Sequence, residues 1–278
     1  MLGIDGMARS VLFFSFLFLI SVCLAFLYIF GFPQLCIAIL SLTTLSIVYL
    51  LFHPRNQWMV ANRSRVDGAS LNGRRCIALT FDDGPDPVYT PKLLDLLREK
   101  NVKATFFVIG KRADQYPEIV RRAWAEGHLV GNHTWSHYPL FCFLMPGRLR
   151  AEIERCTQSI RRSCGFPPRL FRSPVGLRHP LLAPYLENAG LEYLSWSIRT
   201  LDTFTASSSV LARRILSRAA TGDIILLHDH LPRGTDAMLE ALPQVIDELR
   251  ERGFEFVLAA PREDAGGTLE PTTCEPVP

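Results

Sequence analysis

From Cys76 to Leu258, short apolar runs alternate with longer amphipathic stretches, and this alternation constrains the fold more than any other feature. The apolar runs have strand length and end at turn residues, which is typical of buried strands. The stretches between them have helix length, and Gly127 and Gly190 stand at favoured helix ends. About seven such repeats predict parallel strands joined by crossover helices, in a closed barrel or an open doubly wound sheet. In either α/β fold, binding residues collect at the C-terminal ends of the strands.

The boundaries of these elements follow from the apolar runs and the turn residues. We expect strands at residues 76–81, 104–109, 128–131, 169–172, 192–198, 223–227 and 254–258. We expect helices at residues 91–100, 114–126, 148–162, 179–188, 207–220 and 236–252.

Two uncharged apolar segments precede this region. Residues 10–30 are long enough to span a bilayer, and residues 34–52 are almost as long. A cleaved signal peptide is the alternative, but the first run exceeds a signal h-region and the second follows it like a stop-transfer segment. We therefore expect a transmembrane helical hairpin in residues 1–53, a linker in 54–74, one α/β domain in 75–260 and a disordered tail in 261–278.

Basic residues flank the hairpin but are absent from its connector. Arg9 precedes the two apolar segments, and Arg55, Arg63 and Arg65 follow them. The positive-inside rule then favours the cytoplasmic side of a bacterial-type cytoplasmic membrane for both ends and for the main domain. If only one segment spans the membrane, the domain lies on the other side.

Composition excludes several classes of function. The net charge of +3 and the pI near 8.5 give no sign of a nucleic-acid surface. The seven cysteines form no CxxC pair, which argues against a zinc ribbon or a thiol-redox motif. Scattered unpaired thiols suit a reducing compartment better than an oxidising one.

Ionisable side chains stand at or just after the ends of five of the expected strands. They are Asp82 and Asp83, His133 and His137, Arg172, Asp202, and His228. Acidic residues in an Asp-Asp-Gly turn are often solvated loop residues, and a single histidine beside an apolar run is often part of the core. The coincidence of such residues at several strand ends favours a functional site instead.

The His133-x-x-x-His137 spacing is compatible with a metal site. On a helical turn, residues four apart project from one face, so both imidazoles can bind one divalent ion. Thr134 stands where a HExxH metalloprotease has its glutamate. Asp83 is a candidate third ligand, which leaves Asp82 free to act as a base. Arg172 can orient a carboxylate through its planar fork of donors.

Four motifs resemble those of the polysaccharide deacetylases, the NodB-homology domain of carbohydrate esterase family four. They are TFDDGP at 80–85, HTWSH at 133–137, FRSPVG at 171–176 and LLHD at 226–229, in family order. The resemblance covers residues 75–258 and implies a distorted (β/α) barrel of seven or eight strands. A further family motif, Asp-x-x-Asp-Trp, is imperfect here because only Asp202 matches, and Arg199 and Thr203 replace the first Asp and the Trp.

The resemblance also implies a role for each matching residue. Asp82 corresponds to the general base, Arg172 to the residue that orients it, His228 to the general acid and Asp202 to the support of that histidine. Asp83, His133 and His137 correspond to the metal ligands, with Zn²⁺ first and Co²⁺, Ni²⁺ or Mn²⁺ as alternatives. Pro174, Val175 and Leu226 correspond to substrate contacts, although Val175 replaces an aromatic residue often found there.

The function implied is a metal-dependent hydrolase that removes N-acetyl groups from amino sugars of a polysaccharide or cell-wall glycan. An alternative is a deacetylase or deformylase of a lipid-linked amino sugar at the cytoplasmic face of the membrane. A more distant alternative is a non-catalytic glycan-binding module. The presence of both Asp82 and His228 argues against that module.

Overall fold

The computed structural model describes residues 6–53, 56–66, 73–205, 207–230 and 236–261. The tail beyond residue 261, for which the sequence predicts disorder, therefore lies outside the described residues. The strands are β1 (Asn62–Arg63), β2 (Arg75–Asp82), β3 (Thr105–Val108), β4 (Leu129–Asn132), β5 (Leu170–Phe171), β6 (Glu192–Leu194), β7 (Ile198–Arg199), β8 (Ile224–His228) and β9 (Phe254–Phe256). The α-helices are α1 (Gly6–Ile29), α2 (Pro33–Phe52), α3 (Tyr89–Glu99), α4 (Gly110–Gln115), α5 (Pro117–Ala125), α6 (Pro146–Cys164), α7 (Leu182–Ala189), α8 (Ser208–Leu216) and α9 (Ala237–Glu251).

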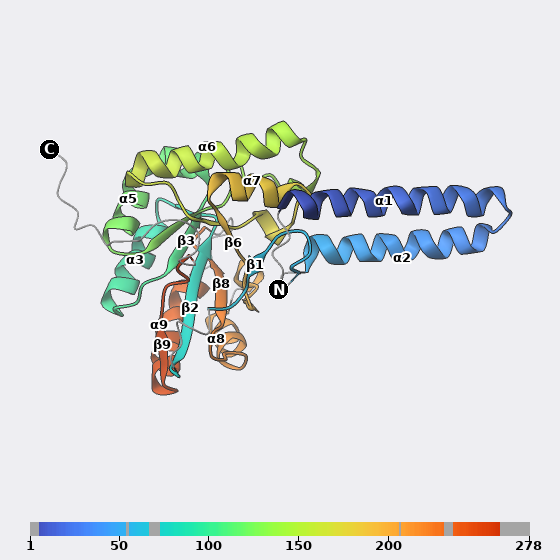
Figure 1. Cartoon of the computed structure of the whole chain (residues 1–278). Coiled ribbons are helices and arrows are strands. Elements are labelled where there is room, and N and C mark those ends of the chain that lie inside the picture. The colour runs from blue at the N-terminus through green and yellow to red at the C-terminus, as the bar shows by residue number, and fades with distance from the viewer. Residues whose placement is uncertain (1–5, 54–55, 67–72, 206, 231–235, 262–278) are drawn as a thin grey trace.

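The described strands form one curled parallel sheet with helices around it (Figure 1). The strand order is β1-β6-β5-β4-β3-β2-β8-β7, and β9 pairs with the first residues of β2. All the pairings between these strands are parallel. Within the described residues, β1 and β7 pair with different neighbours and not with each other, so the barrel stays open along that side. The α/β class and the distorted barrel predicted from the sequence are confirmed.

Strand β2 lies at the centre of the sheet and of the core. Seven of its eight residues are buried, because β3 and β8 cover its edges and helices cover its outer face. Its neighbour β8 is paired in register, so Asp82, the last residue of β2, lies opposite His228, the last residue of β8. The C-terminal ends of the central strands therefore present ionisable side chains at one edge, as the sequence predicts.

Two expected elements are each divided in the structure. The helix expected at residues 114–126 is two helices, α4 and α5, because Pro117 cannot continue α4 and instead begins α5. The strand expected at residues 192–198 is divided into β6 and β7, which pair with different neighbours. At the break, the carbonyl oxygens of Leu194 and Ser195 accept hydrogen bonds from the Arg172 side chain.

Part of the segment expected to be a linker pairs with the sheet. Asn62 and Arg63 form β1 beside β6, and Arg65 forms an antiparallel bridge with Asp223. Arg63 is buried, and its Nε donates to Glu192 at 2.7 Å. These contacts fix residues 62–65 against the sheet.

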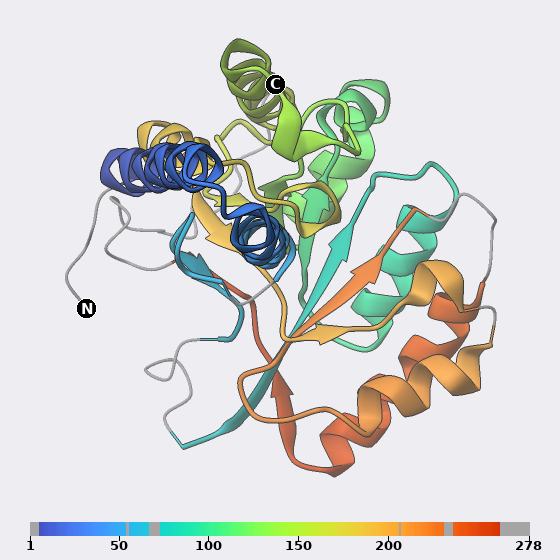
Figure 2. The same ribbon diagram turned by 90° about the vertical axis from the view of Figure 1, so that its right-hand side faces the viewer.

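The N-terminal helices form an antiparallel hairpin that projects from the domain (Figure 1). Both are long and apolar enough to cross a membrane, and most of their side chains are exposed. Figure 2 looks toward the domain along the hairpin, with the two helices seen nearly end-on. The base of the hairpin is attached to the domain, because Phe13 and Leu51 pack with Leu177. The Ser10 hydroxyl also donates to Pro180 O at 2.8 Å.

Candidate active site

The end of β2 places two neighbouring carboxylates in different surroundings. Asp82 ends the strand and is buried. Asp83 follows with φ of 76°, in the left-handed region that only a few residue types adopt readily. Gly84 continues the turn, and no larger residue fits there because a Cβ atom would lie 2.1 Å from Oδ2 of Asp229. The two acidic residues therefore leave the strand in different directions, which permits separate tasks.

Arg172 holds Asp82 from beneath the site. Its side chain is fully buried, and Nη1 donates to Asp82 Oδ1 at 2.7 Å and to Thr80 Oγ1 at 2.9 Å. Nε and Nη2 donate to the carbonyl oxygens of Leu194 and Ser195 at 3.0 and 2.9 Å. A buried guanidinium needs such partners for its donors. The geometry fixes the orientation of the Asp82 carboxylate, as the sequence predicts for this pair.

The segment 133–137 brings its two histidines together by a different backbone from the one expected. It is a bend and not a helical turn, with positive φ at Thr134 and His137. Asn132 Oδ1 accepts the Thr134 N–H at 2.9 Å, and Glu152 accepts both the N–H and the hydroxyl of Ser136 at 2.7 Å. These side-chain caps satisfy backbone groups that a helix would have paired internally.

Asp83, His133 and His137 converge on one point. Asp83 Oδ1 lies 3.3 Å from His133 Nε2 and 3.1 Å from His137 Nε2. One ligand atom from each residue lies within 4.8 Å of the other two. The expected third ligand is therefore brought to the two histidines by the fold.

The donor set fits a divalent metal ion. His133 Nδ1 lies 2.7 Å from the Arg172 carbonyl oxygen, which assigns its proton to that nitrogen and leaves Nε2 as a lone-pair donor. Asp83 Oδ1 is buried without a hydrogen bond in the described residues, although both imidazoles lie beside it. Ligand atoms about 2.1 Å from one ion are separated by roughly 3 Å or slightly more, which matches these contacts. Burial opposes ionisation of Asp83, but when the two imidazoles are protonated, as they can be without a cation, they hold the pKa of Asp83 well below its ordinary value.

His228 faces the same point from β8. Its Nδ1–H donates to Asp202 Oδ1 at 2.9 Å, and its backbone N–H donates to Asp202 Oδ2 at 2.7 Å. The Thr200 hydroxyl lies 2.9 Å from Asp202 Oδ1. Burial disfavours the charged imidazole, but the Asp202 carboxylate raises the pKa of His228 to about 9. At neutral pH the ring is therefore protonated, and Nε2–H is available as an acid.

A cavity of about 200 Å³ joins these groups. Asp82, Asp83, His133, His137 and His228 form its polar side. Val175 and Leu226, both expected substrate contacts, line the cavity, whereas the third, Pro174, is buried and does not. Pro174 begins the 3-10 turn η3 (Pro174–Gly176), which carries Val175 with φ of 57°. Pro174 therefore contributes to the shape of the turn and not to the lining of the cavity.

Sequence reasoning missed several residues at the mouth of the cavity. They are Gly176, Trp196, Arg199, Leu201, Thr203 and Phe204. Arg199 and Thr203 stand at the two positions where the imperfect motif departs from the family pattern, so the departure itself was an available signal. Leu201 and Phe204 carry no such signal, because an exposed apolar residue in or beside a short 3-10 turn has no characteristic spacing.

A third carboxyl group, Asp229, lies beneath the two predicted ones. It is buried, its side chain accepts a hydrogen bond from the Thr90 hydroxyl at 2.7 Å, and its backbone N–H donates to Asp82 O. Burial raises the pKa of Asp229 to about 7, and the nearby charges of Asp83 and Asp82 act in the same direction. This residue adds a third acidic group to the charge balance of the site.

Comparisons with known proteins agree with this geometry. A family model described as polysaccharide deacetylase matches residues 70–194. A peptidoglycan-N-acetylglucosamine deacetylase of Bacillus cereus is 35% identical over 181 residues, which are 65% of this chain and 66% of that protein. A chitooligosaccharide deacetylase of Bradyrhizobium is 37% identical over 197 residues, covering 67% of this chain and 90% of that protein. A crystal structure of a peptidoglycan N-acetylglucosamine deacetylase superposes with a TM-score of 0.67 at 31% identity, covering 71% of this chain and 90% of that chain.

Proposed function

Because this chain belongs to the polysaccharide deacetylase family, we propose that it is a metal-dependent hydrolase that removes N-acetyl groups from amino sugars of a glycan. One observation carries the proposal. Asp82 and His228 face one cavity from paired positions on β2 and β8, each oriented by its own buried partner, beside a His₂Asp ligand set. A base, an acid and a metal site within one cavity are the groups that amide hydrolysis requires.

Asp83, His133 and His137 are the residues that would hold the cation. Zn²⁺ is the first candidate, with Co²⁺, Ni²⁺ and Mn²⁺ as alternatives that the same donor set accepts. When bound, a divalent cation supplies Lewis-acid polarisation of the acyl carbonyl group and lowers the pKa of the attacking water. The remaining chemistry belongs to side chains of this chain.

Asp82 is the proposed general base. Arg172 occupies its Oδ1, so Oδ2 is the oxygen that faces the cavity and accepts the proton of the attacking water. Oδ2 lies 3.8 Å from His133 Nε2, which places it beside the ligand set but outside hydrogen-bonding distance of that ring. This separation keeps the Asp82 carboxylate available for proton transfer.

His228 is the proposed general acid. An amine leaves an acyl group readily only after it is protonated, and the imidazolium supported by Asp202 can give its Nε2 proton to that nitrogen. Acetate and the free amino sugar are then the products. Since the proton is needed at bond cleavage, His228→Gln should lower turnover far more than it weakens substrate binding.

The turn η3 supplies the proposed oxyanion contact. The N–H groups of Gly176 and Leu177 donate to carbonyl oxygens within the turn at 3.0 Å each, which leaves the Val175 N–H as the candidate donor. Removal of a single donor of this kind in other enzymes costs about 3 kcal/mol. Leu226 offers an apolar contact for the acetyl methyl group.

We further propose that the hairpin anchors the enzyme in a bacterial-type cytoplasmic membrane. The two helices have the length and composition for this, and the basic residues after the hairpin favour the cytoplasmic side for the domain. A C-terminal alkaline phosphatase fusion tests the side, because phosphatase activity would contradict the cytoplasmic topology.

Acetate release from N-acetylated oligosaccharides tests the activity itself. We expect release by the full chain, loss after treatment with a chelator, and recovery on addition of Zn²⁺. Asp82→Asn should abolish release without preventing metal binding. Activity that is insensitive to chelator would refute the metal dependence, and a metal-loaded protein that binds glycan without hydrolysing it would favour the non-catalytic module.

A further inference from the structure

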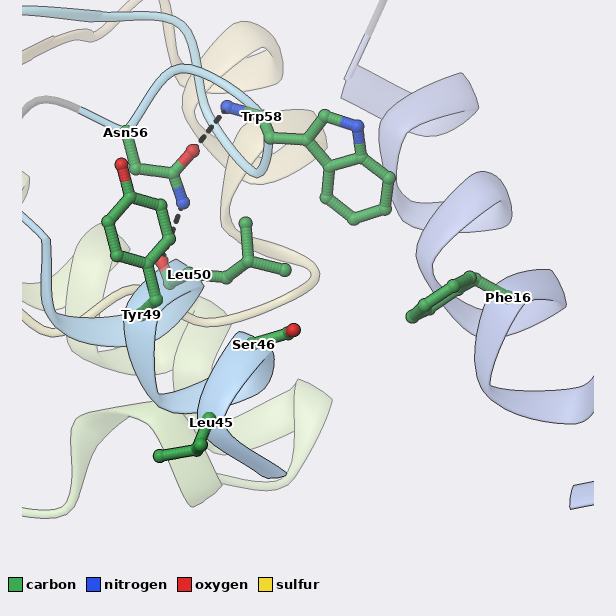
Figure 3. Close-up of a pocket in the computed structure, with 7 residues that line it drawn as sticks. All are labelled: Phe16, Leu45, Ser46, Tyr49, Leu50, Asn56 and Trp58. Atoms are coloured by element: carbon green, nitrogen blue, oxygen red, sulfur yellow. Dashed lines mark hydrogen bonds between the residues drawn. The ribbon is translucent and has the colours of Figure 1, made fainter. Parts of the chain in front are cut away.

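A second, larger cavity lies at the base of the hairpin, away from the ionisable groups of the active site. Its volume is about 550 Å³. In Figure 3, Phe16 projects from α1 toward Ser46 and Leu50 on α2, and Trp58 extends from the following segment toward α1. Trp58 also packs against α1 through an edge contact with Phe13, with 6.2 Å between ring centroids. The cavity thus lies open between the two helices and the segment that carries Trp58.

The lining is suited to a hydrocarbon chain and not to a polar ligand. The few polar side chains are already paired locally, since the Ser46 hydroxyl donates to Leu42 O at 2.8 Å. The Asn56 side-chain amide donates to Leu50 O and accepts a hydrogen bond from the backbone N–H of Trp58, each at 2.8 Å. Apolar side chains supply most of the remaining surface. In the membrane proposed for the hairpin, a lipid chain is the occupant that such a space can take.

One short segment, residues 176–178, contacts the base of the hairpin and also borders the active site. Leu50 lines the cavity, and the carbonyl oxygen of the next residue, Leu51, accepts the Arg178 N–H at 3.2 Å. Arg178 is buried and also donates to His53 O at 2.8 Å. Two residues before Arg178, Gly176 lines the active-site mouth. The base of the hairpin and the active-site mouth therefore meet at residues 176–178.

The active-site mouth carries a cation that no acidic side chain neutralises among the described residues. Arg199, at the end of β7, is exposed and lines the cavity that contains Asp82 and His228. Within the same described ranges its side chain has no hydrogen bond or ion pair. Arginine binds phosphate through its planar fork of donors. A guanidinium placed at the entrance to a sugar-deacetylating site favours a substrate with an anionic group close to the sugar.

We propose that the substrate is an N-acylated amino sugar joined through a phosphate ester to a lipid chain. The chain occupies the cavity between α1 and α2, Arg199 binds the phosphate, and the acyl group enters the site between Asp82 and His228. Water adds across the amide, so the C–N bond breaks, acetate leaves, and the amine, the phosphate ester and the lipid stay together. This inference rests on the proposed deacetylase activity and narrows its substrate.

Three synthetic probes separate the contribution of the chain from that of the charge. They are a long-chain alkyl phosphate of N-acetylglucosamine, a neutral long-chain alkyl glycoside of the same sugar, and N-acetylglucosamine 1-phosphate. The full chain in lipid nanodiscs is assayed for acetate release and, as Asp82→Asn, for binding of each probe. The wild-type protein should prefer the alkyl phosphate over both of the others by at least about tenfold for each missing part, because burial of roughly two methylene groups, or one charge-assisted contact, already corresponds to about tenfold.

Two pairs of variants test the two contacts. Ser46→Trp fills the cavity, and Thr44→Trp is its control, because Thr44 is an exposed residue of α2 with the same hydrogen bond to its own helix. Arg199→Gln removes the cation, and Arg213→Gln removes an exposed arginine of α8 outside the cavity. Ser46→Trp should reduce the preference for the two chain-bearing probes over N-acetylglucosamine 1-phosphate. Arg199→Gln should reduce the preference for the two phosphate-bearing probes over the neutral glycoside.

The outcomes distinguish this inference from the proposed function. Equal rates on the three probes, or changes of preference as large in the control variants as in the test variants, would overturn the lipid-phosphate substrate and leave the deacetylase intact. Absence of acetate release from every probe and from oligosaccharides would refute the deacetylase. In that case the binding order measured with Asp82→Asn still decides the inference, because equal affinities for the three probes would contradict it.

Discussion

Replacing Asp202 by Asn is expected to move the alkaline limit of activity to lower pH. The Asp202 carboxylate accepts two hydrogen bonds from His228, one from the ring and one from the backbone. The pKa of His228 is about 9, compared with 6.5 for an ordinary histidine. That difference corresponds to about 3 kcal/mol in favour of the charged ring, against a burial effect that acts in the opposite direction. Asn keeps the shape but loses the charge, so the pKa of His228 should fall to 6.5 or below.

The size of the effect follows from the protonated fraction. At pH 8 a group with a pKa of 9 is about 90% protonated, and one with a pKa of 6.5 is about 3% protonated. A reaction that needs imidazolium therefore loses about thirtyfold at pH 8 and much less at pH 6. A divalent cation at Asp83 lowers the pKa of His228 in both proteins, so both alkaline limits, and the pH at which the thirtyfold loss is reached, move to lower pH by the same amount while the difference between the two limits remains.

The assay is the pH dependence of kcat/KM for acetate release between pH 5 and 10. Asp247→Asn is the matched control, since Asp247 is a surface acid that pairs with Lys100. Nuclear magnetic resonance titration of the His228 ring in the metal-free protein provides a second measurement. An alkaline limit that is the same in Asp202→Asn and in the wild-type protein would refute the assignment of His228 as the acid supported by Asp202.

Three further changes have defined outcomes. Asp83→Asn should reduce bound Zn²⁺ at least tenfold by elemental analysis after dialysis, whereas His230→Gln, which alters a histidine outside the ligand set, should not. Gly176→Ala should lower the melting temperature and acetate release more than Gly165→Ala does. Both glycines have φ near +80°, but only at Gly176 would the added Cβ atom lie 2.4 Å from a ring atom of Trp196. Arg172→Lys should lower kcat at least a hundredfold, because one ammonium cannot replace a fork with four hydrogen bonds; unchanged kcat would exclude the orienting role.

The centre of the site was predictable because sheet register positions it. Asp82 and His228 each end an apolar run, and parallel pairing of those runs places them opposite each other. The same reasoning applies to Arg172, which follows β5. An alternation of apolar runs and turn residues is enough to locate the ends of strands, and parallel strands share one functional edge. The amino-acid sequence alone is therefore enough to assign these three residues to one site.

The backbone of the histidine segment was not predictable in the same way. The sequence suggested a helical turn, but Thr134 and His137 have positive φ, and the segment is held by hydrogen bonds to Asn132 and Glu152. Glu152 lies on α6, far along the chain from the segment that it caps. A local pattern cannot reveal a cap supplied by another element. The two histidines lie together as predicted, but the predicted helical turn is wrong, and their role as a ligand pair stays a prediction.

The mouth of the cavity is where sequence patterns give the least information, and the reason is physical. Val175 and Leu201 line it in the left-handed region, which costs a non-glycine residue of the order of 1 kcal/mol or more and which neither residue type favours. Such conformations persist only when neighbouring contacts impose them, here the turns η3 and η4 (Asp202–Phe204). Residues fixed by sheet register carry the groups proposed for the chemistry, whereas residues on these turns line the mouth through which we propose that the substrate enters. Arg199 departs from the family pattern at this same border, which is the part of the fold that can change its substrate without disturbing the base and the acid.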